Sequence, residues 1–174
     1  MEAKSGVLTV RELVLYTLLG TVMFALKIVM AGLPNIEPVS LLVILYTLTF
    51  RRRAFWPISL YVLLEVLVWG MNLWTVNYLY IWAILAFLTH LFRSMDSVLG
   101  WAVLAGAFGL CFGLLCSPVY WAIGGWAFAL NWWVSGIPYD LFHCIGNFFI
   151  TLILFKPCRR VLEQLCEQYR HKNP

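Results

Sequence analysis

Three polar side chains near the end of the chain have the types and spacing that chemistry needs. His143 and Asn147 follow Asp140 after three and seven residues, so a helix would place a carboxylate, an imidazole and a carboxamide on one face. Asp140 and His143 could work as an acid/base pair, or all three groups could hydrogen-bond a ligand. A third interpretation is a hydrogen-bond network between helices, in which each bond contributes only ~0.6 kcal/mol.

Two further stretches repeat polar and aromatic side chains at helical spacing. Glu65 is followed by Trp69 after four residues and by Asn72 after three more, and Trp82 follows Tyr78 after four. Side chains at these intervals share a helix face. The three faces fall near the same predicted side of the molecule, so we predict that they converge on one ligand pocket.

The predicted contacts are completed by two other segments. Asn131 and Trp133 precede the stretch that begins at Asp140, and Asn35 and Glu37 lie in a turn-rich outer loop. Tryptophan faces stack on planar rings, while carboxylates and carboxamides orient a ligand through hydrogen bonds. The alternative for Asn72 and its neighbours Trp74 and Asn77 is an ordinary position at the membrane interface.

Four ionisable residues lie within otherwise apolar stretches. Lys27, Glu37, Glu65 and Asp140 would each cost roughly 2.5–3.5 kcal/mol to insert into a bilayer, so each needs a partner, a watery cavity or a function. Lys27 and Glu65 could simply neutralise one another across two helices. His90, which stands alone near the end of the fourth predicted span, is expected to be an interfacial residue rather than a site.

The positions of Lys and Arg along the sequence predict the helices that hold these residues. Eleven of the twelve Lys and Arg residues punctuate apolar stretches: Lys4, Arg11, Arg51, Arg52, Arg53, Arg93, Lys156, Arg159, Arg160, Arg170 and Lys172. About 40, 40 and 60 residues separate the clusters, enough for two crossings each at roughly 20 residues per crossing. Because basic loops stay cytoplasmic, the pattern predicts six transmembrane helices with both termini in the cytoplasm.

Composition indicates the same class. Hydrophobic residues make up 63% of the 174-residue chain and charged residues 11%, against roughly 25% charged in a soluble domain. The net charge of +4 lies in loops and tails, so it does not indicate nucleic-acid binding. We predict an all-α polytopic membrane protein with a single domain over 1–174, a cytoplasmic N-terminus over 1–12 and an amphipathic cytoplasmic tail over 157–174. A removable signal peptide is not expected.

The predicted spans differ in how clearly they are bounded. Their approximate limits are 13–31, 39–50, 54–71, 76–92, 98–115 and 137–155. Residues 116–136 contain Pro118, a glycine pair and many aromatic side chains, which suggests a segment lying in the outer interface. The tail is predicted to lie along the inner surface.

Two helix faces consist of small residues spaced four apart. One contains Thr17, Thr21 and Ala25, and the other runs along the fifth span at Ala105, Gly109 and Gly113. Small faces let helices approach closely in a membrane. Each face could pack within the chain or dock another membrane protein.

Several absences narrow the function. The sequence has no GxxxxGK[ST], GxSxG or HExxH motif, which removes the ATP-binding loop and two hydrolytic devices. The five cysteines have no CxxC spacing, and we expect neither a metal site nor a cofactor. We therefore do not predict an enzyme, and energy for active transport would have to come from partners or an ion gradient.

A six-span chain of this length, with the loop Leu33-Pro34-Asn35-Ile36-Glu37-Pro38 and a small-residue face in its first span, resembles the substrate-binding S component of energy-coupling factor (ECF) vitamin transporters. The resemblance covers essentially the whole chain. It implies an outward-facing vitamin pocket capped by that loop and by the aromatic segment before Pro138. It also implies that Thr17, Thr21 and Ala25 meet a transmembrane coupling subunit that works with two cytoplasmic ATPases.

Together these observations predict a multi-pass protein of a prokaryotic plasma membrane that captures a small heterocyclic micronutrient. With three acids against one lysine around the pocket, an amine-bearing or cationic ligand is favoured. Thiamine, its aminopyrimidine precursor or a queuosine-type deazapurine would suit better than a flavin or folate. The alternatives are an intramembrane enzyme that uses Asp140 and His143, and a membrane assembly factor without a ligand.

Overall fold

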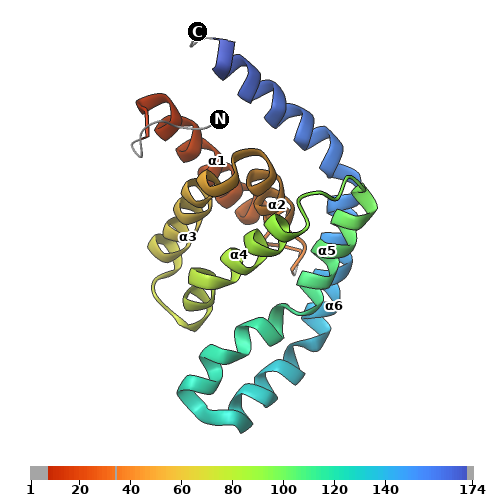
Figure 1. Cartoon of the computed structure of the whole chain (residues 1–174). Coiled ribbons are helices and arrows are strands. Elements are labelled where there is room, and N and C mark those ends of the chain that lie inside the picture. Colours follow the sequence, from red (N-terminus) through yellow and green to blue (C-terminus); the bar gives the residue numbers. More distant parts are fainter. Residues whose placement is uncertain (1–7, 34, 172–174) are drawn as a thin grey trace.

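The computed structural model describes residues 8–33 and 35–171, apart from the side chains of 169–171, and every regular element in that part is helical (Figure 1). The elements are α1 (Val10–Val29), α2 (Val39–Phe50), the 3-10 helix η1 (Arg51–Ala54), α3 (Phe55–Trp69), α4 (Leu73–Leu91), α5 (Val98–Leu110) and α6 (Phe112–His171). The predicted bounds of the second span coincide with α2, and those of the first, third and fourth spans lie within three residues of α1, α3 and α4.

Three helical stretches in the described part are long and apolar enough to cross a bilayer. They are α1, α4 and the stretch Val98–Gln168 that includes α5 and most of α6. Helices α2 and α3 have 12 and 15 residues, fewer than the roughly 20 of a full crossing. All regular structure in the described part of the chain is thus helical, as predicted, and the apolar helices are compatible with a membrane protein.

Helix α6 is in fact two antiparallel helices that meet at a sharp turn (Figure 1). Gly125 forms the turn with φ of 75°, a conformation that glycine adopts without strain. The predicted interfacial segment 116–136 therefore becomes the tip of a helical hairpin, which projects beyond the other helices. Pro118 does not break this helix: it cannot donate to the Leu114 carbonyl four residues back, but the Ser117 hydroxyl donates to that carbonyl at 2.7 Å.

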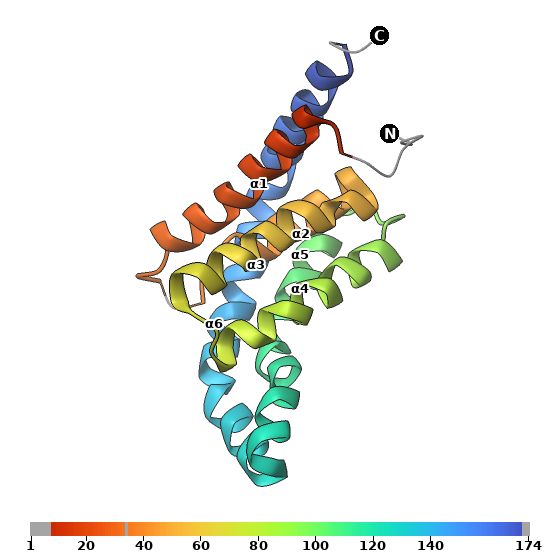
Figure 2. The ribbon, with the colours of Figure 1, turned by 90° about the vertical axis from the view of Figure 1, so that its left-hand side faces the viewer.

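The described part of the C-terminal tail is helical. It continues α6 through Pro157 and projects away from the bundle (Figure 2). An ion pair between Arg159 and Glu163, one helical turn apart at 2.9 Å, supports the continued helix. Leu162 is buried, so the tail also contributes to the core.

Small residues allow α5 and the returning arm of α6 to pack closely. A side chain at Gly109 would come within 2.8 Å of the His143 backbone, and one at Gly113 within 2.5 Å of the Asp140 carboxylate. The small face of the fifth span is therefore used inside the chain. In α1, Gly20 plays a similar role against α3, because a β-carbon at this position would come within 2.7 Å of the Pro57 carbonyl oxygen.

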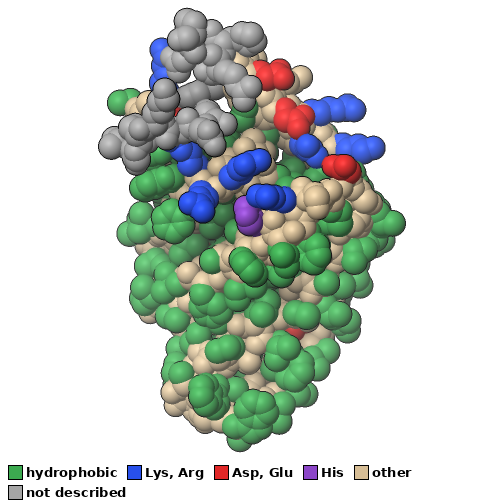
Figure 3. Space-filling model, viewed as in Figure 1, with side chains coloured by type: hydrophobic (Ala, Val, Ile, Leu, Met, Phe, Trp, Pro, Cys, Tyr) green, Lys and Arg blue, Asp and Glu red, His purple; other side chains and the backbone are tan. Residues whose placement is uncertain are grey.

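Positive charge is concentrated at one end of the molecule. Figure 3 shows the Lys and Arg side chains gathered near the two termini, while hydrophobic side chains cover most of the remaining visible face. We call this the basic end; it includes η1, the α4–α5 connection and the α6 segment around Arg159. The loops 30–38 and 70–72 lie at the opposite ends of the short helices.

Candidate functional site

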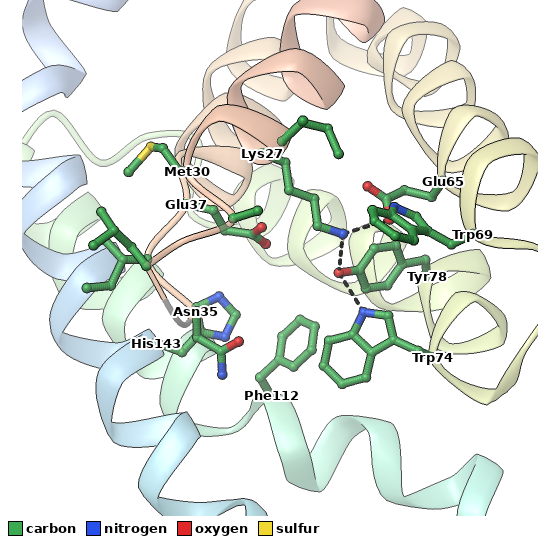
Figure 4. Close-up of a pocket in the computed structure, with 14 residues that line it drawn as sticks. Lys27, Met30, Asn35, Glu37, Glu65, Trp69, Trp74, Tyr78, Phe112 and His143 are labelled. Atoms are coloured by element: carbon green, nitrogen blue, oxygen red, sulfur yellow. Dashed lines mark hydrogen bonds and ion pairs between the residues drawn. The ribbon is translucent and has the colours of Figure 1, made fainter.

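A cavity of about 310 Å³ lies opposite the basic end, where α1 and α3 end and α4 begins (Figure 4). We call it the aromatic cavity. It is lined by Lys27, Ile28, Met30, Ala31, Leu33, Asn35, Ile36, Glu37, Glu65, Trp69, Trp74, Tyr78, Phe112 and His143. The volume is at the low end of the roughly 300–1,000 Å³ typical of small-molecule sites, which favours a compact ligand.

One wall of the aromatic cavity is a chain of hydrogen bonds from three helices. The Lys27 ammonium forms an ion pair with Glu65 at 2.7 Å and donates to the Tyr78 hydroxyl at 3.0 Å. The Trp74 indole also donates to that hydroxyl, at 3.0 Å. Lys27 and Glu65 therefore do neutralise one another, as the alternative interpretation held, and they line the cavity as well. The second Glu65 oxygen, Oε1, is buried without a hydrogen-bond partner in the described part of the chain.

Aromatic rings supply the other walls. Trp69, Trp74, Tyr78 and Phe112 all line the cavity, and Trp69 is 57% exposed. Trp82, a predicted contact, instead lies behind them: it is fully buried, with ring centroids 5.4 Å from Tyr78 and 6.0 Å from Phe112. Trp82 thus supports the wall. The exposed rings of Trp69 and Trp74 can stack on a planar ligand.

The loop after α1 closes one side of the cavity, in the position expected of a lid. Asn35 and Glu37 both line the cavity. The Asn35 side chain donates to the Tyr139 carbonyl at 3.1 Å, and Ile36 packs against Gly146, where a β-carbon would lie 3.1 Å from Ile36. Asn35 has φ of 55°, which asparagine tolerates better than most residues. These two contacts fasten the loop to α6.

Glu37 brings a titratable carboxylate into the cavity. Figure 4 shows it pointing toward the end of the Lys27 side chain. Burial raises the pKa of Glu37 to about 7; the Lys27 ammonium opposes this rise and the Glu65 carboxylate adds to it. Near neutral pH this group can therefore accept a hydrogen bond as a carboxylate or donate one as an acid.

His143 is the only member of the Asp140, His143 and Asn147 face that lines the cavity. It is 3% exposed, and neither ring nitrogen has a hydrogen-bond partner in the described part. Its ring packs edge-on against Phe112, with centroids 4.7 Å apart. Buried imidazole nitrogens normally have partners, so His143 is available to a ligand.

Asp140 and Asn147 are engaged elsewhere. Both Asp140 oxygens accept from the Gly113 amide, at 3.0 and 3.2 Å, and Asn147 donates to the Ser40 hydroxyl at 3.0 Å and to the Ala105 carbonyl at 3.4 Å. Neither residue lines the cavity. Here the alternative interpretation applies, because the Asp140 bonds join the two arms of α6 and the Asn147 bonds join α6 to α2 and α5. His143 forms no hydrogen bond to Asp140 in the described chain, so the acid/base pair is not assembled.

Three other predicted contacts lie outside the cavity. Asn72 caps α4, accepting from the amides of Trp74 at 2.9 Å and Thr75 at 3.1 Å. Asn131 is exposed and Trp133 is half-buried on the projecting hairpin. The reason for the difference is the hairpin itself, whose helical arms place residues near the tip beyond the cavity.

Three of the charged and aromatic side chains that line the cavity, those of Lys27, Trp74 and Phe112, were not among the predicted contacts. The sequence marks Lys27 as an unusual residue, because it is a charge in an apolar span. The ion pair with Glu65 that the sequence suggested for it did not imply contact with a cavity. Trp74 lies four residues before Tyr78, a spacing that places both on one helix face. Phe112 had no signal, because its position depends on the break between α5 and α6 at Cys111.

The small-residue face of α1 points away from the rest of the chain. Thr17, Thr21 and Ala25 are all exposed, and the Thr21 hydroxyl donates back to the Thr17 carbonyl at 2.8 Å. That bond satisfies the hydroxyl within the helix, so the face is compatible with an apolar neighbour. Packing against the described remainder of the chain is not its role.

In the described part of the chain, no group of three or more His, Cys, Asp or Glu side chains could hold a metal ion. Comparison of the chain with protein families, with curated proteins and with solved structures gave no significant match.

Proposed function

We propose that this chain is the membrane-embedded substrate-binding subunit of an ECF-type importer for a small heterocyclic vitamin or vitamin precursor. The observation that carries the proposal is the aromatic cavity. It combines exposed ring faces, an ionisable carboxylate at Glu37 and unpartnered polar atoms on Glu65 and His143. A mostly apolar cavity with a few convergent polar groups is the usual form of a small-molecule site.

The charges in the cavity define the ligand more sharply than its aromatic walls do. Because Lys27 and Glu65 compensate one another, Glu37 supplies the uncompensated charge, and Asp140 does not contribute. An amine-bearing or cationic ring is therefore favoured over an organic acid. The small volume of about 310 Å³ also favours thiamine, its aminopyrimidine precursor or a deazapurine base over a flavin or folate.

In the proposed topology the chain crosses the membrane six times, with the basic end and both termini in the cytoplasm of a prokaryotic cell. The aromatic cavity then faces the outer leaflet. Helices α2 and α3 are short for full crossings, so this topology requires the bilayer to be thinner beside them or the helices to be flanked by polar side chains. Cysteine labelling with a membrane-impermeant maleimide, in a cysteine-free background, should reach position 124 but not position 52 in intact cells.

A coupling subunit and two cytoplasmic ATPases complete the proposed importer. The exposed face at Thr17, Thr21 and Ala25 is the proposed contact with the coupling subunit. Replacing Thr21 with leucine should reduce co-purification of that subunit, because a larger side chain prevents close helix approach. Equal co-purification with the variant would remove this face as the docking surface.

Native mass spectrometry of the mildly solubilised chain tests the function itself. We expect a small molecule of vitamin mass to be retained without chemical change. A chain that never carries a small molecule, even after exposure to the candidate vitamins, would favour an assembly factor. Turnover of a bound compound by the purified chain would instead indicate an enzyme.

A further inference from the structure

A second cavity, of about 320 Å³, lies at the basic end of the molecule. We call it the basic cavity. It is bounded by the end of α2 and the adjoining η1, by the end of α4 and the α4–α5 connection, and by the part of α6 around Arg159. In the proposed topology all of these segments lie on the cytoplasmic side. The residues that give it its character are Thr47, Arg51, His90, Arg93, Asp96 and Arg159.

Positive charge predominates in this lining. Three guanidinium groups, on Arg51, Arg93 and Arg159, face one carboxylate, on Asp96. In the described part of the chain, the side chains of Arg51 and Arg93 take part in no ion pair, and Asp96 has no partner. Arg159 uses Nε to bind Glu163 at 2.9 Å, which leaves its two terminal nitrogens available. The cavity thus holds donors suited to an anion.

A neighbouring arginine shows that not every basic residue near the cavity lacks an ion pair. Arg53, two positions after Arg51, forms an ion pair with Glu12, which also belongs to the capping box at Thr9. Arg53 does not line the cavity. Arg53 is therefore neutralised within the chain, at a place outside the basic cavity.

A buried hydroxyl gives a second and independent indication. Thr47 lines the cavity and is only 7% exposed, yet its Oγ1 has no hydrogen-bond partner in the described part. A buried hydroxyl without a partner is destabilising, and an anion oxygen in the cavity would accept its proton. Thr89, also in the lining, differs because its hydroxyl donates to the Leu85 carbonyl at 2.8 Å.

The surface next to the cavity is apolar. On α4, Phe87 and Leu91 are 66% and 61% exposed, and Phe92 at the end of that helix is 46% exposed. These residues flank His90, whose position in the sequence predicts an interfacial residue. A charged group in the cavity could therefore belong to a molecule whose apolar part lies along α4.

We propose that the basic cavity binds a phosphate-bearing anion. Guanidinium forks match phosphate oxygens in two-point hydrogen bonds, and basic pockets between transmembrane helices on the cytoplasmic side bind anionic headgroups. The apolar face of α4 makes the headgroup of an anionic phospholipid the leading source, with free phosphate as the other. This site is independent of the ligand in the aromatic cavity.

The test is native mass spectrometry of the full chain released from nanodiscs that contain equal amounts of phosphatidylglycerol and phosphatidylcholine. A parallel arm titrates inorganic phosphate into the detergent-solubilised chain and follows thermal unfolding. Retention of phosphatidylglycerol over phosphatidylcholine supports the proposal and identifies the source as lipid. Stabilisation by phosphate without lipid preference supports it with a soluble source. The absence of both effects overturns it.

Matched variants locate the effect. Each of Arg51→Gln and Arg93→Gln should lower anion retention about fivefold, as expected for one basic residue at a membrane surface. Thr47→Val, which changes shape very little, should also reduce retention while the chain still folds. Arg52→Gln is the control, because Arg52 is exposed beside Arg51 but does not line the cavity. An equal loss in Arg52→Gln would show non-specific surface attraction and overturn the site.

Discussion

The aromatic and basic cavities are nearly equal in volume, about 310 and 320 Å³, yet opposite in chemistry. The aromatic cavity presents rings and two carboxylates, one of them paired with Lys27. The basic cavity presents three arginines around a buried, unpartnered hydroxyl. Selectivity at each end is therefore expected to follow the sign and placement of charge more than the space available.

The two cavities also differ in how their charged side chains are partnered. Around the aromatic cavity, Lys27 is satisfied by Glu65 and Tyr78, which fixes the wall before any ligand arrives. In the basic cavity, Arg51 and Arg93 have no such partners among the described residues. The charge of Lys27 is thus paired within the chain, whereas Arg51 and Arg93 are exposed and remain available to an anion.

The largest effect should follow from breaking the ion pair of the aromatic cavity. Lys27→Met leaves the 1% exposed Glu65 carboxylate unpaired, which should destabilise the fold by about 3–5 kcal/mol. The double variant Lys27→Met/Glu65→Leu should recover most of this loss, because it removes both charges. Thermal unfolding in mild detergent measures both. Identical midpoints for the single variant and the wild type would show that the pair does not organise this wall.

A smaller effect is expected from the aromatic wall. Trp69→Ala should weaken binding of the favoured ligand about thirtyfold, as expected for a central aromatic contact worth about 2 kcal/mol. Thiamine is a suitable first ligand, and its binding can be measured from the change in the intrinsic fluorescence of the protein. Asn131→Ala is the matched control, since Asn131 is exposed on the hairpin away from the cavity. Similar losses in the two variants would contradict the cavity as the binding site, and neither should alter anion retention at the basic end.

The smallest effect concerns pH. The pKa of Glu37 is raised to about 7, so its charged form, which attracts a cation, is lost as pH falls through that value. If the cation binds only the carboxylate form, affinity should be about tenfold weaker at pH 6 than at pH 8. The Glu37→Gln variant should bind thiamine with a flat profile. A wild-type affinity that does not change over this range would assign no role to Glu37.

Much of the helical framework could be predicted from the sequence because breaks in hydrophobicity coincide with basic or turn-forming residues. The triple arginine ends α2 at Phe50, as predicted. The hairpin could not be predicted in this way, because Pro118, the glycine pair and the aromatic side chains of residues 116–136 suggest an interfacial segment and not two helical arms. The helix continues through Pro118, beside which the Ser117 hydroxyl donates to the Leu114 carbonyl, a local bond that composition does not reveal.

The candidate site could be predicted only in part, because contacts between helices cannot be read from the spacing of residues along one helix. Glu65, Trp69, Tyr78 and His143 line the cavity, as helical spacing suggested, and so do Asn35 and Glu37 of the loop that the resemblance indicated. Asp140 shares the His143 face, yet the Gly113 amide occupies it. Spacing along one helix identifies residues on a common face, but it does not say which of them a neighbouring helix will bind.

The central claim is that the aromatic cavity holds a small heterocyclic ligand, and one paired measurement tests it most directly. Wild-type chain and Trp69→Ala are purified in parallel, exposed to the same mixture of thiamine, its aminopyrimidine precursor and the deazapurine base, and compared by native mass spectrometry. We expect one of these compounds on the wild type and little or none on the variant. Equal occupancy of the two chains, or no compound on either, would contradict the claim.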